Sequence, residues 1–289
     1  MKIRAALFSL LVIYLSTPEA RSETRDWTNT AGKTITAELL GVENENATLK
    51  LENGREYTIA LNTLSEGDQT YAKSWQEEQI ALAEAPSPAT KPLMTVPGKL
   101  LYHSDLTTID SDWSIPCGEW EATSEGLTGA ELAADDHAAV FKRSQTIKDV
   151  IIEFDIMIGE SKSAMFGIDG NGHLCRLSIS RRLFQARKDD SDKEGPDTAK
   201  MFNAAEANFE PDEWQTVRIE LLGEEMLAQT GEHISMGSDP SLAGDKAKWG
   251  FVVSGEAVGF RNLSIWEASL NEDWEKEGAR LRRSLDIEE

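Results

Sequence analysis

Val150–Ile158, with the sequence Val-Ile-Ile-Glu-Phe-Asp-Ile-Met-Ile, is the stretch that decides the fold of this 289-residue chain. Every second residue from Ile152 to Ile158 is apolar, and two of the residues between them, Glu153 and Asp155, are acidic. Alternation with a period of two is typical of a β-strand that buries one face and turns the other to solvent. We therefore predict a strand of a large sheet, with Glu153 and Asp155 on its solvated face.

Runs of the same kind recur on both sides of this strand and are separated by turns rich in Gly, Asn and Asp. The expected strands are 100–102, 120–122, 126–129, 138–141, 150–158, 164–168, 174–179, 183–188, 214–222, 226–229, 249–253 and 258–267. Residues 189–208 are polar without alternation, and we expect a long loop there. About a dozen short strands over roughly 170 residues predict a two-sheet antiparallel sandwich spanning 100–268.

Several landmarks of this region follow one another in a characteristic order. They are Gly118-Glu119-Trp120, Asp149–Asp155, Glu213–Ile219 and Asn262–Trp266. With these landmarks the region resembles the concanavalin A-like jelly rolls of the 3-keto-disaccharide hydrolase or family 16 glycoside hydrolase-like type, which occur in exported bacterial proteins. The resemblance implies a jelly-roll sandwich with a carbohydrate ligand.

The catalytic pattern of those families is incomplete in this chain. Family 16 glucanases carry Glu-x-Asp-x-x-Glu on one strand, and the corresponding positions here are Glu153, Asp155 and Ile158. Retaining hydrolysis needs two carboxyl groups roughly 5–5.5 Å apart on one face, so the loss of the third acid argues against this chemistry. The Asn-Ser-Gly-Ile-x-x-Arg segment of the keto-disaccharide family is also absent, with Ser163–Ile168 in its place. Glu153 and Asp155 remain the catalytic candidates if the protein is an enzyme.

The region before the sandwich has its own pattern of short strands. Lys33–Val42 alternates apolar and polar residues, and Asn53-Gly54 is a hairpin signal between two further strands. Ser65 is a plausible N-cap for a helix that runs from about Glu66 to Trp75. Five short strands closed by one helix predict a small SH3-like barrel over 23–76.

This first region resembles the first Sla homology domain, an SH3-like module. The resemblance rests on Arg25–Thr28, Gly32–Val42, Asn53-Gly54-Arg55 and the segment Leu64–Tyr71. It implies a binding module without catalysis, which in a eukaryotic endocytic adaptor binds an Asn-Pro-Phe peptide motif. Trp27 and Tyr71 either line such a peptide groove or belong to the core of the module, and the core is the simpler interpretation.

The remaining segments are a leader, a linker and a tail. Residues 1–22 predict a signal peptide, with a basic start, the apolar run Ala5–Leu15 and small residues before a cleavage site at Glu23. We therefore expect a secreted or periplasmic protein, with no membrane span after cleavage. Residues 77–99 are rich in Pro and Ala and predict an extended linker. Residues 269–289 predict a C-terminal surface helix with Asn271 as its N-cap and Trp274 packed on the sandwich.

Charge excludes two classes of partner. The chain carries 51 Asp and Glu against 29 Lys and Arg, a formal net charge of −22. Binding to nucleic acid or to an anionic membrane surface needs clustered Lys and Arg, so neither partner is expected. One positive cluster stands out and comprises Arg176, Arg181, Arg182, Arg187 and Lys188. It either binds an anionic sugar or a partner's carboxylates, since Arg pairs with them bidentately, or balances the neighbouring Asp189–Asp192.

Other ligand-binding candidates lie near expected turns. Trp113 and Trp120 could stack on sugar rings, and His173 could stand beside a glycan. The turn from Asp169 to His173 is either an ordinary Gly/Asn/Asp turn or a structural Ca²⁺ site that uses Asp169 and Asn171. No other cofactor is expected.

The only two cysteines are Cys117 and Cys175. In an oxidising compartment they could form a disulfide, and the alternative is two free thiols inside strands.

Taken together, the sequence predicts an all-β protein in which a small SH3-like barrel is linked to a concanavalin A-like two-sheet jelly-roll sandwich and followed by a C-terminal helix. The expected function is that of an exported, non-catalytic, lectin-like protein that binds carbohydrate or a cell-envelope component, with the SH3-like region as an accessory module that binds a peptide motif. One alternative is a glycoside or 3-keto-glycoside hydrolase with non-standard acids. A second is a structural protein of the cell envelope that binds other proteins.

Overall fold

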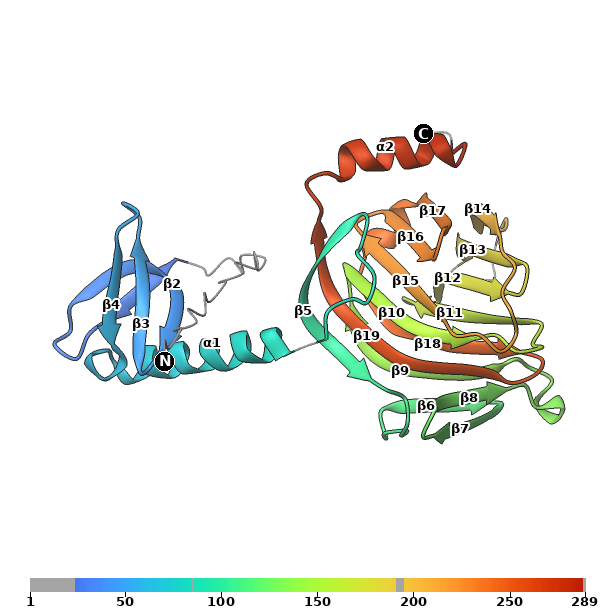
Figure 1. Ribbon diagram of the computed structural model, residues 1–289, viewed down its shortest axis with the longest axis horizontal. Coiled ribbons are helices and arrows are strands. Elements are labelled where there is room, and N and C mark those ends of the chain that lie inside the picture. The colour runs from blue at the N-terminus through green and yellow to red at the C-terminus, as the bar shows by residue number, and fades with distance from the viewer. Residues whose placement is uncertain (1–23, 85, 191–194, 288–289) are drawn as a thin grey trace, which may run out of the picture. The chain divides into compact units, whose positions relative to one another are not determined.

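The computed structural model describes residues 24–84, 86–190 and 195–287. Contacts divide the chain into two compact units, 1–83 and 84–289 (Figure 1). The expected signal peptide, 1–22, lies outside the described residues. No helix in the described ranges combines the length and the apolar composition that a membrane crossing needs.

The first unit is a four-stranded antiparallel sheet followed by a helix. Its elements are β1 (Arg25–Thr28), β2 (Thr34–Glu43), β3 (Asn46–Leu51), β4 (Glu56–Ala60), the 3₁₀ turn η1 (Leu61–Thr63) and α1 (Glu66–Glu84). The strands pair in chain order, and a single bridge joins Asn29 to Leu64, so the described part of this unit has four strands and not the five expected. Trp27 is buried, and Tyr71 packs edge-on against its ring at 5.7 Å. Both aromatic rings therefore contribute to the core of this unit.

A polar cluster joins the start of α1 to β1. Ser65 Oγ donates to Asp68 at 2.8 Å and accepts from its backbone N–H at 3.3 Å, as expected of an N-cap. The Asp68 carboxylate also accepts from Thr28 N and from Arg25 Nη2, both at 2.8 Å. The helix continues well past the expected end at Trp75, as far as Glu84.

The second unit is a sandwich of two antiparallel sheets. Its strands are β5 (Thr95–Ser104), β6 (Trp113–Cys117), β7 (Glu119–Thr123), β8 (Gly126–Ala130), β9 (Ala139–Ile147), β10 (Val150–Met157), β11 (Ser163–Asp169), β12 (His173–Ser180), β13 (Leu183–Lys188), β14 (Lys200–Glu206), β15 (Gln215–Leu222), β16 (Glu225–Thr230), β17 (His233–Ser238), β18 (Lys246–Ser254) and β19 (Val258–Leu270). One sheet has eight strands in the order β17-β16-β15-β10-β19-β8-β7, with β5 also paired to β19. The other has seven, in the order β14-β13-β12-β11-β18-β9-β6. The all-β class and the sandwich are confirmed.

The core lies between the two sheets. Phe154 of β10 contacts Phe166 of β11 and Phe251 of β18, with ring centroids 5.3 and 5.2 Å apart. Ile152 and Ile156 share the inward face of β10 with Phe154 and are buried in the same cluster. The alternating apolar residues that predicted this strand are therefore the ones that face the core.

The expected loop at 189–208 contains a strand instead. β14 pairs with β13 at the edge of the seven-stranded sheet, and Phe202 is buried there against Gly237. Only one large apolar residue of β14 points inward, so the sequence has too little alternation to reveal the strand.

The expected linker, 77–99, is much shorter than its composition suggested. α1 occupies its start, and β5 begins at Thr95. Pro97 is accommodated in β5 because it pairs with Ala268 at an irregularity of the register. Residues 86–94 between these elements lie on the outer face of the eight-stranded sheet, where Trp266 Nε1 donates to Pro86 O at 2.8 Å. We call residues 86–95 the strap.

The C-terminal helix is present as α2 (Trp274–Ser284). Trp274 is buried with Met94, Leu227 and Met236, which fixes the helix to the sandwich. Asn271 is not the N-cap: Asp273 precedes the helix, and Asn271 Nδ2 donates to Leu93 O at 2.9 Å. Its side chain thus ties the end of β19 to the strap.

Candidate functional site

The outer face of the seven-stranded sheet carries a row of cross-strand neighbours with two glycines at its centre. The row is Lys142, Gly250, Gly167, Arg176 and Arg187, from β9 to β13. Most of their neighbours along the strands, such as Phe141, Phe166 and Leu177, point the other way into the core, as the period of two requires. At Gly167 a Cβ atom would meet nothing within 4 Å. The backbone of β11 is therefore left uncovered at Gly167, between basic side chains on either side. Gly250 is buried instead, and a Cβ atom there would collide with Phe141 O.

This uncovered strip forms a pocket of about 300 Å³, which we call the trough. Val140, Val252 and Met165 line it on one side of the glycines, and Lys142, Asp169 and Arg176 are among its polar lining. His173 and His137 stand at its rim, and both are exposed. The trough therefore combines an apolar strip with a small number of charged groups.

Each of the two carboxylates in the trough is held by two basic groups. Asp169 pairs with Lys142 and lies 3.0 Å from His173 Nδ1. Asp189 accepts from Arg176 Nε and Arg187 Nε, each at 2.7 Å. Among the residues that the structure describes, no other acid lines the trough.

Arg176 keeps hydrogen-bonding capacity toward the trough. Its Nε is used by Asp189, and its Nη1 lies 3.3 Å from Met165 Sδ. Within the described ranges, no protein group accepts a hydrogen bond from its Nη2. This donor is available to a ligand.

A second pocket of about 300 Å³ lies at the other end of β11 and β12, and we call it the turn pocket. Its lining is Ser161, Lys162, Ser180, Arg181, Arg182 and Asn208. Arg181 pairs with the exposed Glu160 at 3.2 Å. For Lys162 and Arg182, the described part of the chain supplies no acidic partner. Of the positive cluster seen in the sequence, Arg176 lines the trough and Arg181 and Arg182 line the turn pocket. Lys188 is buried and donates to Thr198.

The tryptophans proposed as sugar platforms lie elsewhere. Trp113 is 7% exposed, and its ring stacks on Phe141 at 4.2 Å in the core. Trp120 is half-buried on β7, where it packs against Phe141 and Phe260 and rests on Gly129. Both rings have a packing role, and neither lines the trough or the turn pocket.

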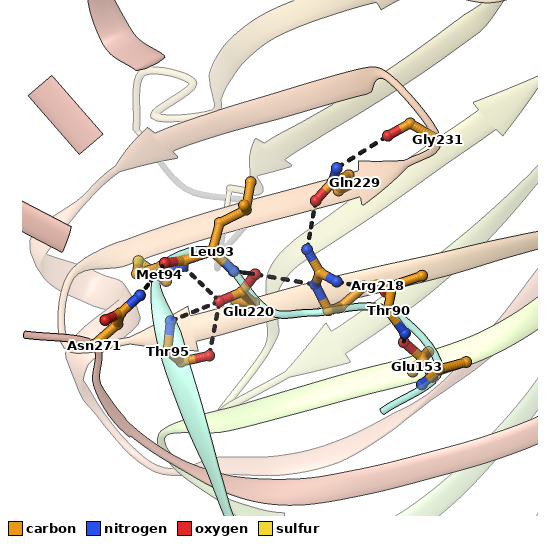
Figure 2. A network of polar contacts seen from close by, with 11 residues as sticks. Thr90, Leu93, Met94, Thr95, Glu153, Arg218, Glu220, Gln229, Gly231 and Asn271 are labelled. Carbon is orange, nitrogen blue, oxygen red and sulfur yellow. Dashed lines mark hydrogen bonds and ion pairs between the residues drawn. The ribbon is translucent and has the colours of Figure 1, made fainter. Parts of the chain in front are cut away.

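The catalytic candidate Glu153 is on the opposite sheet and holds the strap (Figure 2). Its carboxylate accepts from Ala89 N at 2.6 Å, from Thr90 N at 3.3 Å and from Thr90 Oγ1 at 2.9 Å. Glu153 is only 6% exposed, so the expectation of a solvated position is wrong for this residue. The strap buries Glu153, and the alternation within the strand could not predict that a distant segment would lie over it.

Two residues of β15 complete this network and were not anticipated. Glu220 accepts from the backbone N–H groups of Leu93, Met94 and Thr95 at 2.8–2.9 Å. Arg218 donates to Glu220 at 3.0 Å and contacts Gln229 and Thr90. Figure 2 shows Glu220 and Arg218 side by side beneath the strap. An Arg-x-Glu pair on the face expected to be polar gave no sign that it is buried.

Asp155 is committed to a second local cluster. It accepts from Thr216 Oγ1 at 2.7 Å, Arg261 Nε at 3.1 Å and Asn262 Nδ2 at 2.8 Å. The Arg261 guanidinium also lies over the Trp214 ring, 4.2 Å from its centroid. These contacts give Asp155 a role in joining β10, β15 and β19.

Both cysteines are free thiols. Cys117 is on β6 and Cys175 on β12, and β9, β18 and β11 lie between them in the sheet. Four steps of about 4.8 Å place the two strands roughly 19 Å apart, far beyond the ~7 Å limit for a disulfide. Cys175 is fully buried, and burial raises the pKa of its thiol to about 12.

For the possible Ca²⁺ site, the described residues contain no group of three or more His, Cys, Asp or Glu side chains that could hold a metal. The Asp169 carboxylate is paired with Lys142 and His173, and Asn171 lies in the turn between β11 and β12. These partners account for Asp169 without a cation.

No protein-family model matches the sequence, and no curated protein matches it either. Among solved structures, a Bacillus subtilis protein of unknown function with a galectin-like fold is similar, with a TM-score of 0.51 and 16% identity over 62% of this chain and 100% of that one. Porphyranase B from Zobellia galactanivorans has a TM-score of 0.49 and 10% identity over 65% of this chain and 100% of its own. The carbohydrate-binding module CBM66 from Bacillus subtilis has a TM-score of 0.45 and 15% identity over 54% and 96%. The likeness to the Bacillus subtilis protein with a galectin-like fold shows that the sandwich has this fold.

Proposed function

We propose that the sandwich is a non-catalytic carbohydrate-binding domain and that the trough holds the saccharide. The observation that carries this proposal is the open floor at Gly167, bordered by an apolar strip on one side and charged groups on the other. Small-ligand sites combine apolar walls with a few placed polar groups. A sugar ring presents C–H groups on its face and hydroxyl groups at its edge, so it matches both sides of the trough. The galectin-like fold supports the proposal.

Binding without cleavage fits the state of the acids. Retaining hydrolysis needs two carboxyl groups roughly 5–5.5 Å apart, one as a proton donor and one as a nucleophile. Asp169 and Asp189 are each tied to two basic groups, and Glu153 lies beneath the strap on the other sheet. None of these acids stands free at the trough.

The first unit is proposed as the accessory module. A small β unit with a closing helix is consistent with the SH3-like interpretation, and its ligand is expected to be a peptide motif of a cell-envelope partner. Because Trp27 and Tyr71 serve the core, a peptide contact falls to exposed apolar residues of the sheet, among them Ile35, Leu40 and Tyr57. We also propose that the protein is exported to the periplasm or the medium, as the signal peptide expected at 1–22 indicates.

Filling the trough tests its role directly. Gly167→Leu places a side chain into open space in a strand, where a larger residue also favours the β conformation. We expect a wild-type signal on a glycan array for at least one saccharide class, a loss of at least tenfold in affinity for Gly167→Leu, and an unchanged melting temperature.

The matched control is Gly41→Leu, because Gly41 lies in β2 of the first unit and its Cβ would also meet nothing within 4 Å. This variant should bind like the wild type. Equal loss in both variants, or binding that survives Gly167→Leu, contradicts the assignment of the site. Release of shortened saccharides detected by mass spectrometry would contradict the non-catalytic role.

A further inference from the structure

The charge around the trough is opposite in sign to that of the chain. The protein has a net charge of −22, yet the outer face from β9 to β13 carries four basic residues, Lys142, Lys248, Arg176 and Arg187, against Asp169 and Asp189. Since the two acids are internally paired, the excess on this face is positive. A neutral sugar would not need this excess, whereas an acidic one would be attracted by it.

The turn pocket, which lies next to the C-terminal end of β12, is also positively charged. Lys162, Arg181 and Arg182 converge there, and Glu160 is the acid paired with one of them. Arg176, Ser178 and Ser180 share the outer face of β12 and lead from the trough to this pocket. From Arg176 to Ser180 the strand advances four residues, a distance of about 13 Å, and Arg181 and Arg182 form the turn that follows. Two positive sites are therefore joined by a polar track.

From this arrangement we infer that the ligand is a polyanionic oligosaccharide whose acid groups bind at two places along β12, one at Arg176 in the trough and another at Lys162 and Arg182 in the turn pocket. This inference rests on the proposed function. Guanidinium groups form paired, charge-assisted hydrogen bonds with carboxylate and with sulfate oxygens, so uronates and sulfate esters share the required chemistry. Within the described residues, Arg176 Nη2 has no acceptor and Arg182 has no acidic partner, and both observations favour this class of ligand.

Titration calorimetry of the full chain with three series of oligosaccharides tests the inference. The series are oligogalacturonates, sulfated galactan oligosaccharides and neutral gluco-oligosaccharides, each in a short and a long form. We expect both or one of the anionic series to bind, the neutral series to bind at least tenfold more weakly, and the long anionic form to bind about tenfold more tightly than the short form.

Variants assign the two ends. Arg182→Gln and Lys162→Gln should each remove most of the gain from length and leave the short form unaffected. Arg176→Gln should weaken both lengths by about tenfold, and Arg176→Lys, which keeps the charge, should weaken them less. The matched control is Arg283→Gln, which removes the same charge from the exposed face of α2 and should change neither length.

The outcomes separate this inference from the proposed function. Equal binding of neutral and anionic series that is lost in Gly167→Leu would overturn the inference and keep the function. If the long anionic form still binds more tightly than the short form in Lys162→Gln and Arg182→Gln, the second binding site in the turn pocket is overturned. Binding of poly-glutamate as tightly as the oligogalacturonate would replace the saccharide by an acidic peptide. Failure of every saccharide would overturn both proposals.

Discussion

Cys175 lies beneath the trough, on the inward face of β12, and its thiol is fully buried. Desolvation is the main reason for its raised pKa of about 12, against an ordinary value of 9.0. Below pH 9 the folded and unfolded chains both hold this proton. Between about pH 9 and about pH 12 only the unfolded chain releases it, so the free energy of unfolding falls as the pH rises.

We expect this loss to reach about 1 kcal/mol for each pH unit above 9 and to be absent from Cys175→Ala. Urea denaturation of both proteins at about pH 8 and about pH 10.5 measures it. Cys117→Ala is the matched control, since it also lacks one thiol but not the one beneath the trough. Equal pH dependence in the wild type and Cys175→Ala would show that this thiol ionises freely in the folded chain.

At the scale of elements, the strap is held by carboxylates that are buried under it. Glu220 is fully buried and receives three backbone N–H groups of the strap as well as Arg218. Glu220→Ala leaves these donors unpaired and the Arg218 charge buried without its partner. We expect a loss of roughly 3–5 kcal/mol in the free energy of unfolding, measured by urea denaturation.

The control for this prediction is Glu232→Ala, an exposed acid in the turn between β16 and β17, which should change stability by less than about 0.5 kcal/mol. A loss for Glu220→Ala as small as that of the control would mean that the strap contributes little to the sandwich. In that case Glu153 would also have to be reconsidered as an open acid.

The sequence was informative about elements where one face is buried against the core. The inward row of β10, with Ile152, Phe154 and Ile156, was visible as simple alternation. It was uninformative where another segment covers the outer face, because Glu153 on β10 looks like any solvated residue. Burial of that kind depends on a partner distant in sequence, here the strap, and leaves no periodic signal.

The candidate site was predictable only in part for the same reason. Arg176 and His173 were recognised as candidates, and both line the trough. Gly167 forms the floor of the trough but was not predicted. Whether a glycine within a strand leaves open space depends on the side chains that lie beside it on the neighbouring strands, and the sequence does not show which residues those are. Gly250 and Lys142 stand beside it only through the pairing of β9, β18 and β11.

For the whole molecule, the strap moves the boundary of the sandwich toward the N-terminus. The sequence placed that boundary at residue 100, within a proline-rich linker, whereas contacts place it at Glu84. The strap covers Glu153, Glu220 and Trp266 on the outer face of the eight-stranded sheet. A fragment that begins after it would expose two acids and an indole that are buried in the intact unit.

We therefore expect fragment 84–289 to unfold in one cooperative transition. Fragment 96–289 should melt at least 10 °C lower or remain unfolded, because it loses several kcal/mol of strap contacts and each kcal/mol lowers the melting temperature of a domain of this size by about 2–4 °C. Differential scanning calorimetry of both fragments measures the difference. Fragment 84–289 with Trp266→Phe is a milder companion, because it keeps the strap and loses the hydrogen bond to Pro86 O together with part of one buried ring. Equal melting temperatures for the two fragments would show that the strap does not stabilise the sandwich and is only a linker.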